Sequence, residues 1–174
     1  TGQWFYISGP GGSVITTPLA ATTTVSGLTP GIYTFRWNIS NGACPASNDT
    51  VQIEVAALAT VAAAGPDQTL CNGSTTTLAG NTAIVGTGIR TYVSGPGGYV
   101  ITNPSLPATT ITGLVTGTYV FNWTITNSVC PPTTDNVQIT VYDALLNQVS
   151  APVITICAGQ SITINGAIPI GGTG

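Results

Sequence analysis

The chain has very little charge. Charged residues make up 4% of its 174 residues, against roughly 25% in an ordinary soluble domain. It contains no Lys and no His, and its cationic side chains are Arg36 and Arg90. Binding to nucleic acid needs clustered Lys or Arg that neutralise phosphates, and two arginines cannot supply such a cluster. We therefore exclude nucleic acid as a partner and expect Thr, Ser, Asn and Gly to keep the surface polar.

Long apolar runs are lacking too. A membrane-spanning helix needs about 20 consecutive, mainly apolar residues. The longest candidate, Val55 to Gly65, is mostly Ala and too short. We predict no membrane span in this segment, and we expect a polar surface with so few ions to belong to an extracellular protein.

The residues that carry most enzyme chemistry are absent or scattered. Hydrolytic triads and acid–base pairs need His or clustered carboxylates, so we predict no enzyme activity and no cofactor. For the matched pair Asp49 and Asp135, a turn-capping role is favoured over a calcium site. Asp67 is the one candidate calcium ligand, at a junction between units. The acidic residues are Asp49, Glu54, Asp67, Asp135 and Asp143.

An internal repeat of 86 residues is the strongest pattern that is present. Thr1-Gly2 returns as Thr87-Gly88 without a gap, and most of the following motifs return at the same offset. A repeat of fixed length indicates an array of similar units. We predict three parts: 1–56 as the end of one unit, 57–142 as a complete unit and 143–174 as the start of the next. We also expect the protein to extend beyond both ends of this chain.

Each unit shows the alternation of β-strands. In the complete unit a stripe of apolar residues alternates with smaller or polar ones, which places one face of a strand in the core. Shorter strands are predicted between Gly- and Pro-rich turns, and seven short strands in such a unit indicate an all-β sandwich. The stripe is Tyr119, Phe121, Trp123 and Ile125, followed by Val137, Ile139 and Val141, and the shorter strands are 68–71, 75–79, 89–94, 99–102 and 109–111.

The aromatic residues have two possible roles. Tyr119, Phe121 and Trp123 could stack against sugars, but their alternation favours packing in the core. Trp4 stands where the next repeat has Arg90, so the fold does not demand an aromatic there. We expect both residues near the surface or at a contact specific to one repeat.

The four cysteines recur as two kinds. Cys71 and its counterpart Cys157 follow the first predicted strand, and Cys44 and its counterpart Cys130 lie in the last hairpin. This regular pattern, without His, favours disulfides in an oxidising compartment over zinc. We favour a bond between Cys71 and Cys130, although the usual sandwich order puts these positions at opposite ends, beyond bonding distance. Bonds between consecutive units (Cys44–Cys71 and Cys130–Cys157), or partners in repeats outside this chain, remain open.

Several motifs carry a resemblance to a known family. Ala64–Cys71 and Thr77–Asn81, and then Gly113-Leu114, Gly117–Ile125 and Cys130-Pro131, resemble the PKD-like and Ig-like repeats of Bacteroidota giant cell-surface adhesins. That resemblance implies tandem Ig-like/PKD-like β-sandwich domains in an elongated array, an extracellular cell-surface location and export by the type IX secretion system. It also makes Thr50 a candidate glycosylation site, because Asp49-Thr50-Val51 matches a short O-glycosylation pattern of that phylum.

The resulting hypothesis is mechanical. We expect a stalk segment of a long repetitive adhesin or filament, which holds an adhesive tip away from the cell and transmits force in adhesion or gliding motility. Short linkers at 56–64 and 142–150 would limit bending. The expected partners are neighbouring repeats of the same chain and the motility or secretion machinery of the cell surface. The alternatives are spacer modules of a secreted enzyme and a carbohydrate-binding module.

Overall fold

The protein is an all-β protein over the residues that the computed structural model describes, which are 1–71, 73–143 and 154–164. No helix long and apolar enough to cross a membrane occurs in this described part. The predicted start of a third repeat (143–174) and the predicted linker 142–150 lie largely outside it. The strands of the described residues are β1 (Gly2–Ser8), β2 (Val14–Ile15), β3 (Val25–Ser26), β4 (Gly31–Ile39), β5 (Ser47–Val55), β6 (Gln68–Cys71), β7 (Thr75–Thr77), β8 (Thr87–Ser94), β9 (Val100–Ile101), β10 (Thr110–Thr112), β11 (Gly117–Asn127) and β12 (Cys130–Tyr142).

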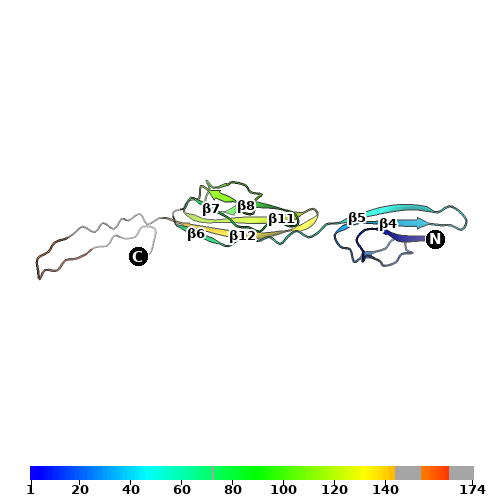
Figure 1. Cartoon of the computed structure of the whole chain (residues 1–174), viewed down its shortest axis with the longest axis horizontal. Coiled ribbons are helices and arrows are strands. Elements are labelled where there is room, and N and C mark those ends of the chain that lie inside the picture. Colours follow the sequence, from blue (N-terminus) through cyan, green and yellow to red (C-terminus); the bar gives the residue numbers. More distant parts are fainter. Residues whose placement is uncertain (72, 144–153, 165–174) are drawn as a thin grey trace. The chain divides into compact units, whose positions relative to one another are not determined.

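The second repeat contains two sheets, and its strands lie close to their predicted bounds (Figure 1). One sheet has the order β6-β12-β11-β8 and the other the order β7-β10-β9. The strand β6 pairs with β12 in parallel, with Cys71 opposite Tyr142, and β10 pairs antiparallel with both β7 and β9. Two mainly antiparallel sheets of this kind make the predicted β-sandwich.

The core of the second repeat is formed by the apolar residues whose alternation predicted it, on β11 and β12. Tyr119, Phe121, Trp123 and Ile125 on β11 are all buried, as are Val137, Ile139 and Val141 on β12. Because successive side chains of a strand point to opposite faces, each stripe faces the interior. Large aromatic rings bury more apolar surface than any other side chain, so this stripe supplies most of the core. The prediction of core packing, rather than a sugar platform, is confirmed for these rings.

The first repeat contains the counterparts of only part of this sandwich. Its sheets have the orders β1-β4-β5 and β2-β3, which match β8, β11 and β12, and β9 and β10, at the 86-residue offset. No counterpart of β6 or β7 occurs among the described residues of this repeat. Val51 is 42% exposed, whereas its counterpart Val137 is 1% exposed.

A tyrosine fixes the same turn in both repeats. The hydroxyl of Tyr119 accepts a hydrogen bond from the backbone N–H of Val115 at 2.9 Å. The hydroxyl of Tyr33 accepts one from the N–H of Thr29 at 2.8 Å. A tyrosine that bonds back to the chain a few residues upstream is a hallmark of Ig-like sandwiches, so both repeats use one local design.

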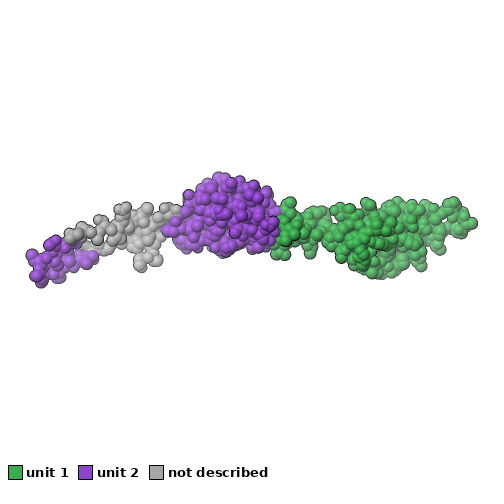
Figure 2. Space-filling view, in the orientation of Figure 1, with its two compact units in different colours: residues 1–61, 83–87, 125–133 green, residues 62–82, 88–124, 134–174 purple. Residues whose placement is uncertain are grey.

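The chain divides into two compact units (Figure 2). Unit 1 comprises residues 1–61, 83–87 and 125–133, and unit 2 comprises residues 62–82, 88–124 and 134–174. These limits differ from the predicted repeat boundaries at 56/57 and 142/143, because residues 56–61 contact 83–87 and 125–133. The repeat boundaries themselves stay a prediction from the sequence.

Candidate functional site

The segment that joins the two repeats, Ala56–Ala64, is hydrogen-bonded along its first half. The carbonyl of Ala57 accepts a bond from the side-chain amide of Asn127 at 2.7 Å. The carbonyl of Thr60 accepts one from the hydroxyl of Thr133 at 2.7 Å, and the N–H of Thr60 donates to the carbonyl of Val85 at 3.0 Å. These bonds lie within unit 1. They satisfy backbone groups that a free linker would leave to water.

The hydroxyl of Thr60 in this connecting segment holds a distant turn. Its oxygen accepts hydrogen bonds from the backbone N–H groups of Ile84, at 3.0 Å, and Val85, at 2.8 Å. One side chain thereby caps two donors of a turn more than twenty residues away in sequence. Sequence reasoning missed this role, because a Thr in an Ala-rich stretch gives no signal of its partner.

The second half of the connecting segment is bonded within unit 2. Ala63 exchanges two bonds with Asn81: its N–H donates to Asn81 Oδ1 at 2.8 Å, and its carbonyl accepts from the Asn81 N–H at 2.9 Å. The N–H of Ala64 donates to Asp135 Oδ2 at 2.7 Å. Ala59, Ala62 and Ala64 are buried. Their small side chains let the backbone approach its partners closely.

Arg90 lies in the core of the second repeat rather than near the surface. It is 2% exposed, and its guanidinium carbon lies 5.3 Å from the centroid of the Trp123 ring. Nη2 donates to the carbonyls of Ala64, at 2.8 Å, and Pro107, at 3.2 Å. Desolvation lowers the pKa of Arg90, and the Asp135 carboxylate partly offsets this by raising it. The prediction of a surface position was wrong for Arg90, whereas the alternative of a contact specific to one repeat holds. Two carbonyls and a ring replace part of the water around the charge, while Nε and Nη1 are buried without a hydrogen-bond partner.

Trp4, the counterpart of Arg90, makes a different contact. Its ring lies 5.2 Å from that of Trp37, and its indole N–H donates to the carbonyl of Ala21 at 3.2 Å. It is half-buried. The same position therefore makes a contact specific to each repeat, as the sequence comparison anticipated.

Three carboxylates accept hydrogen bonds from backbone N–H groups. Asp49 Oδ1 accepts from the N–H of Thr50 at 2.8 Å, and Asp67 Oδ1 accepts from the N–H of Gln138 at 2.8 Å. Asp135, expected to cap its own turn, instead binds Ala64, 71 residues away. No group of three or more His, Cys, Asp or Glu that could hold a metal ion occurs within the described residues. The calcium role of Asp67 stays a prediction without a gathered ligand set.

Thr50, the candidate glycosylation site, lies on β5 with an exposed side chain. It pairs with Arg36 across the sheet. Its side chain is exposed, and the modification itself stays a prediction.

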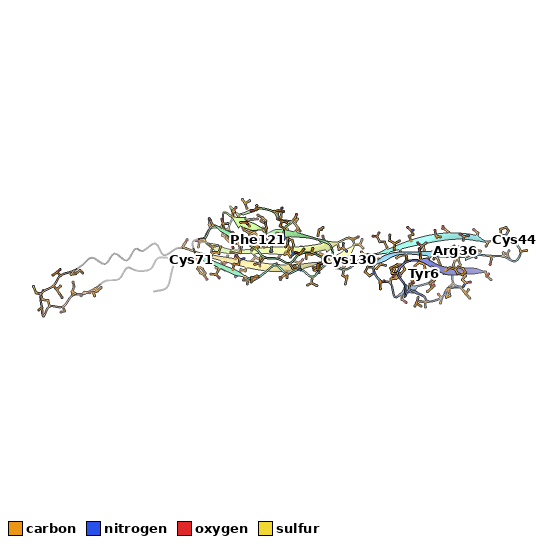
Figure 3. The ribbon with its side chains drawn as sticks, viewed as in Figure 1. Tyr6, Arg36, Cys44, Cys71, Phe121 and Cys130 are labelled. Carbon is orange, nitrogen blue, oxygen red and sulfur yellow. The ribbon has the colours of Figure 1, made fainter. Side chains whose placement is uncertain are left out.

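The structure does not bring Cys71 and Cys130 together. Cys130 begins β12, and Tyr142, at the other end of β12, is the residue that pairs with Cys71 (Figure 3). At about 3.3 Å per residue the 13 residues of β12 separate the two by roughly 40 Å, whereas the Cα atoms of a disulfide lie within about 7 Å. The favoured bond within the unit therefore does not fit this fold. All four cysteines are free in the structure.

Comparison with known proteins agrees with a PKD-type domain in the second repeat. Residues 64–141 match the family model described as K319L-like, PKD domain. The solution structure of the PKD domain from KIAA 1837 protein is 28% identical, with a TM-score of 0.45, and the match covers 52% of this chain and 92% of that one. Mouse cadherin-23 EC22–24 is 12% identical, with a TM-score of 0.39, over 83% of this chain and 54% of that one. No curated protein matches the chain.

The family match supports a PKD/Ig-like domain over residues 64–141. Domains of this family are typically non-catalytic structural modules of extracellular proteins. The family match does not extend to the narrower resemblance to Bacteroidota adhesins, which we treat as a proposal.

Proposed function

We propose that this chain is a stalk segment of a long, repetitive cell-surface adhesin or filament. Its repeats would hold an adhesive tip away from the cell and pass force between that tip and motility or secretion machinery. The observation that carries the proposal is the connecting segment Ala56–Ala64, which has hydrogen-bond partners along most of its length. These partners all lie in the second repeat, so the segment belongs to that sandwich and little free chain follows Val55. A merely permissive linker is instead Gly- or Ser-rich and solvated.

The surface chemistry supports an extracellular location. Thr, Ser, Asn and Gly supply the polarity that charges supply elsewhere, and the family match is to an extracellular type of module. Export by the type IX system and a role in gliding motility are what the resemblance of Ala64–Cys71 and Thr77–Asn81 to the repeats of Bacteroidota adhesins implies, and they belong to this proposal. The neighbouring repeats of the same chain would be the principal partners.

Electron microscopy of the cell surface tests the proposal. Three strains are compared: one with the intact gene, one without it, and one whose gene lacks only the codons for 57–142. We expect thin filaments that disappear with the gene and shorten measurably, without disappearing, when one repeat is removed. Adhesion of the cells to glass is measured in the same three strains, alongside the filaments. A surface that looks the same in all three strains would contradict the stalk role.

Carbohydrate binding is the second candidate, and one pair of rings favours it. Tyr92, which is partly exposed, stacks on Tyr99 with ring centroids 4.6 Å apart and planes inclined by 20°. Stacked tyrosines can form part of a sugar platform, although both rings also contact the buried Phe121. Binding of the full chain to a glycan array, lost in Tyr92→Ala, would favour this candidate over the stalk. Absence of binding would indicate that Tyr92 and Tyr99 only pack against the core.

A further inference from the structure

We propose that consecutive repeats are joined by a disulfide between two recurring positions. These are the hairpin cysteine, represented by Cys44 and Cys130, and the strand cysteine, represented by Cys71 and Cys157. The bond would link the hairpin cysteine of one repeat to the strand cysteine of the repeat before it. Each junction between two repeats would then carry one covalent cross-link.

The register of the second repeat locates the strand cysteine. In that repeat Cys71 lies opposite Tyr142 in the parallel pair of β6 and β12. The residue 86 positions before Tyr142 is Ala56, which directly follows β5, the counterpart of β12. In a first repeat with all its strands, the strand cysteine would therefore lie opposite Ala56, about 4.8 Å away across the sheet.

The hairpin cysteine of the second repeat already lies at that place. Cys130 Sγ is 3.6 Å from the carbonyl oxygen of Ala56, and this contact is internal to unit 1. A strand cysteine opposite Ala56 would be a close neighbour of Cys130. The Cα atoms of a disulfide usually lie about 4.4–6.8 Å apart, which is the geometry that this bond requires.

The other pairings fit less well. Cys71 and Cys130 lie at opposite ends of β12. A Cys130–Cys157 bond would join the hairpin cysteine to the repeat that follows, whereas the contact with Ala56 directs Cys130 toward the repeat that precedes. Cys44 lies at the end of β5 remote from Ala56. By this rule none of the four cysteines in this chain is the partner of another.

The bond forms by ordinary thiol–disulfide exchange. One cysteine thiolate attacks an external disulfide, such as that of an exported thiol oxidoreductase or oxidised glutathione, and releases one thiol. The second cysteine thiolate then displaces the other external thiol from the mixed disulfide. Two protein thiols are oxidised to one disulfide while one external disulfide is reduced to two thiols. Oxidising extracellular compartments supply such reagents.

The chain of residues 1–174 with a second copy of 57–142 inserted after Tyr142 tests the inference. Cys44 and Cys157 are changed to Ser. One variant keeps only Cys71 of the first copy and Cys130 of the second. The matched control keeps only Cys130 of the first copy and Cys71 of the second. Both variants have the same length and the same number of cysteines, so any difference reports the direction of pairing.

Each variant is oxidised with glutathione, and its free thiols are counted by alkylation and mass spectrometry, with circular dichroism as the check of folding. We expect reactive thiols to fall from two per chain to none in the first variant and to stay at two in the control. A bond only in the control, or two free thiols in both folded variants, would overturn the inference. If the first variant folds only when oxidised, a peptide that joins its two cysteines after digestion still identifies the bond, and its absence refutes it. The stalk proposal depends on none of these outcomes.

Discussion

At the scale of single residues, the two tryptophans of the stripe need a glycine on the neighbouring strand. A Cβ atom added to Gly88 would overlap the indole ring of Trp123, and one added to Gly2 would overlap that of Trp37. Neither glycine has a positive φ, so the requirement is one of space. The two rings differ in how far they can move, because Trp123 is fully buried and Trp37 is half-buried.

Gly88→Ala is therefore expected to cost more stability than Gly2→Ala. The buried ring of Trp123 cannot move without displacing the core, and overpacking of this kind costs about 1–3 kcal/mol. In the first repeat the ring of Trp37 can shift toward solvent, and the cost should stay below about 1 kcal/mol. Urea unfolding of the two full-length variants, followed by tryptophan fluorescence, measures the difference. Equal costs would show that the two rings are equally constrained.

Arg90 gives a second prediction at this scale. Arg90→Ala removes the cation–π contact with Trp123 and leaves the carbonyls of Ala64 and Pro107 without this donor. Loss of buried volume and hydrogen bonds should lower the free energy of unfolding by about 3 kcal/mol. Arg36, which lies 5.6 Å from the Phe5 ring and is only half-buried, is the control. Arg36→Ala should cost under about 1 kcal/mol in the same denaturation experiment, and the reverse order would contradict the assignment.

Residue-scale features differ in how well the sequence predicts them. The stripe from Tyr119 to Ile125 was predictable, because a period of two between large apolar residues has one physical meaning in a strand. The burial of Arg90 was not, because charged side chains are rarely buried and its acceptors are backbone carbonyls. The exchange of Trp4 for Arg90 was the signal that one site tolerates either an aromatic ring or a planar cation.

At the scale of elements, the connecting segment Ala56–Ala64 is fixed by bonds that are distant in sequence. Asn127 reaches Ala57 across 70 positions, and Asp135 reaches Ala64 across 71. The strands could be predicted from alternation and turn residues, and β6 matches its expected bounds. The partners of the segment could not, because Thr, Asn and Asp in an irregular stretch are equally typical of solvated turns.

Thr60→Val tests whether these bonds hold the connecting segment. Valine keeps the shape of threonine but cannot accept hydrogen bonds from the N–H groups of Ile84 and Val85. Leaving two donors without this acceptor should cost about 1–3 kcal/mol, and Thr60→Ser should restore most of it. Amide hydrogen exchange at Ile84 and Val85 should become faster in Thr60→Val alone. Unchanged exchange at both amides would mean that the hydroxyl does not restrain this turn.

At the scale of the whole molecule, the repeat was visible in the sequence but the limits of the compact units were not. An offset of 86 residues without gaps predicts two similar sandwiches, and β1–β5 indeed correspond to β8–β12. Residues 56–61 of the connecting segment group with residues 83–87 and 125–133. The limits of the compact units therefore differ from the repeat boundaries predicted at 56/57 and 142/143. The proposed pairing of cysteines belongs to the same scale, because it joins the hairpin cysteine of one repeat to the strand cysteine of the repeat before it.

The central claim is that the repeats are separate sandwiches joined in a row, and small-angle X-ray scattering tests it. The samples are chains of residues 1–174 with zero, one, two or three extra copies of 57–142 inserted after Tyr142. A repeat whose longest strand, β12, has 13 residues should add about 40 Å to the maximum dimension at about 3.3 Å per residue. We predict equal increments for each added copy. Increments that shrink with each copy, as they do when chains merge into one globule, would contradict the account.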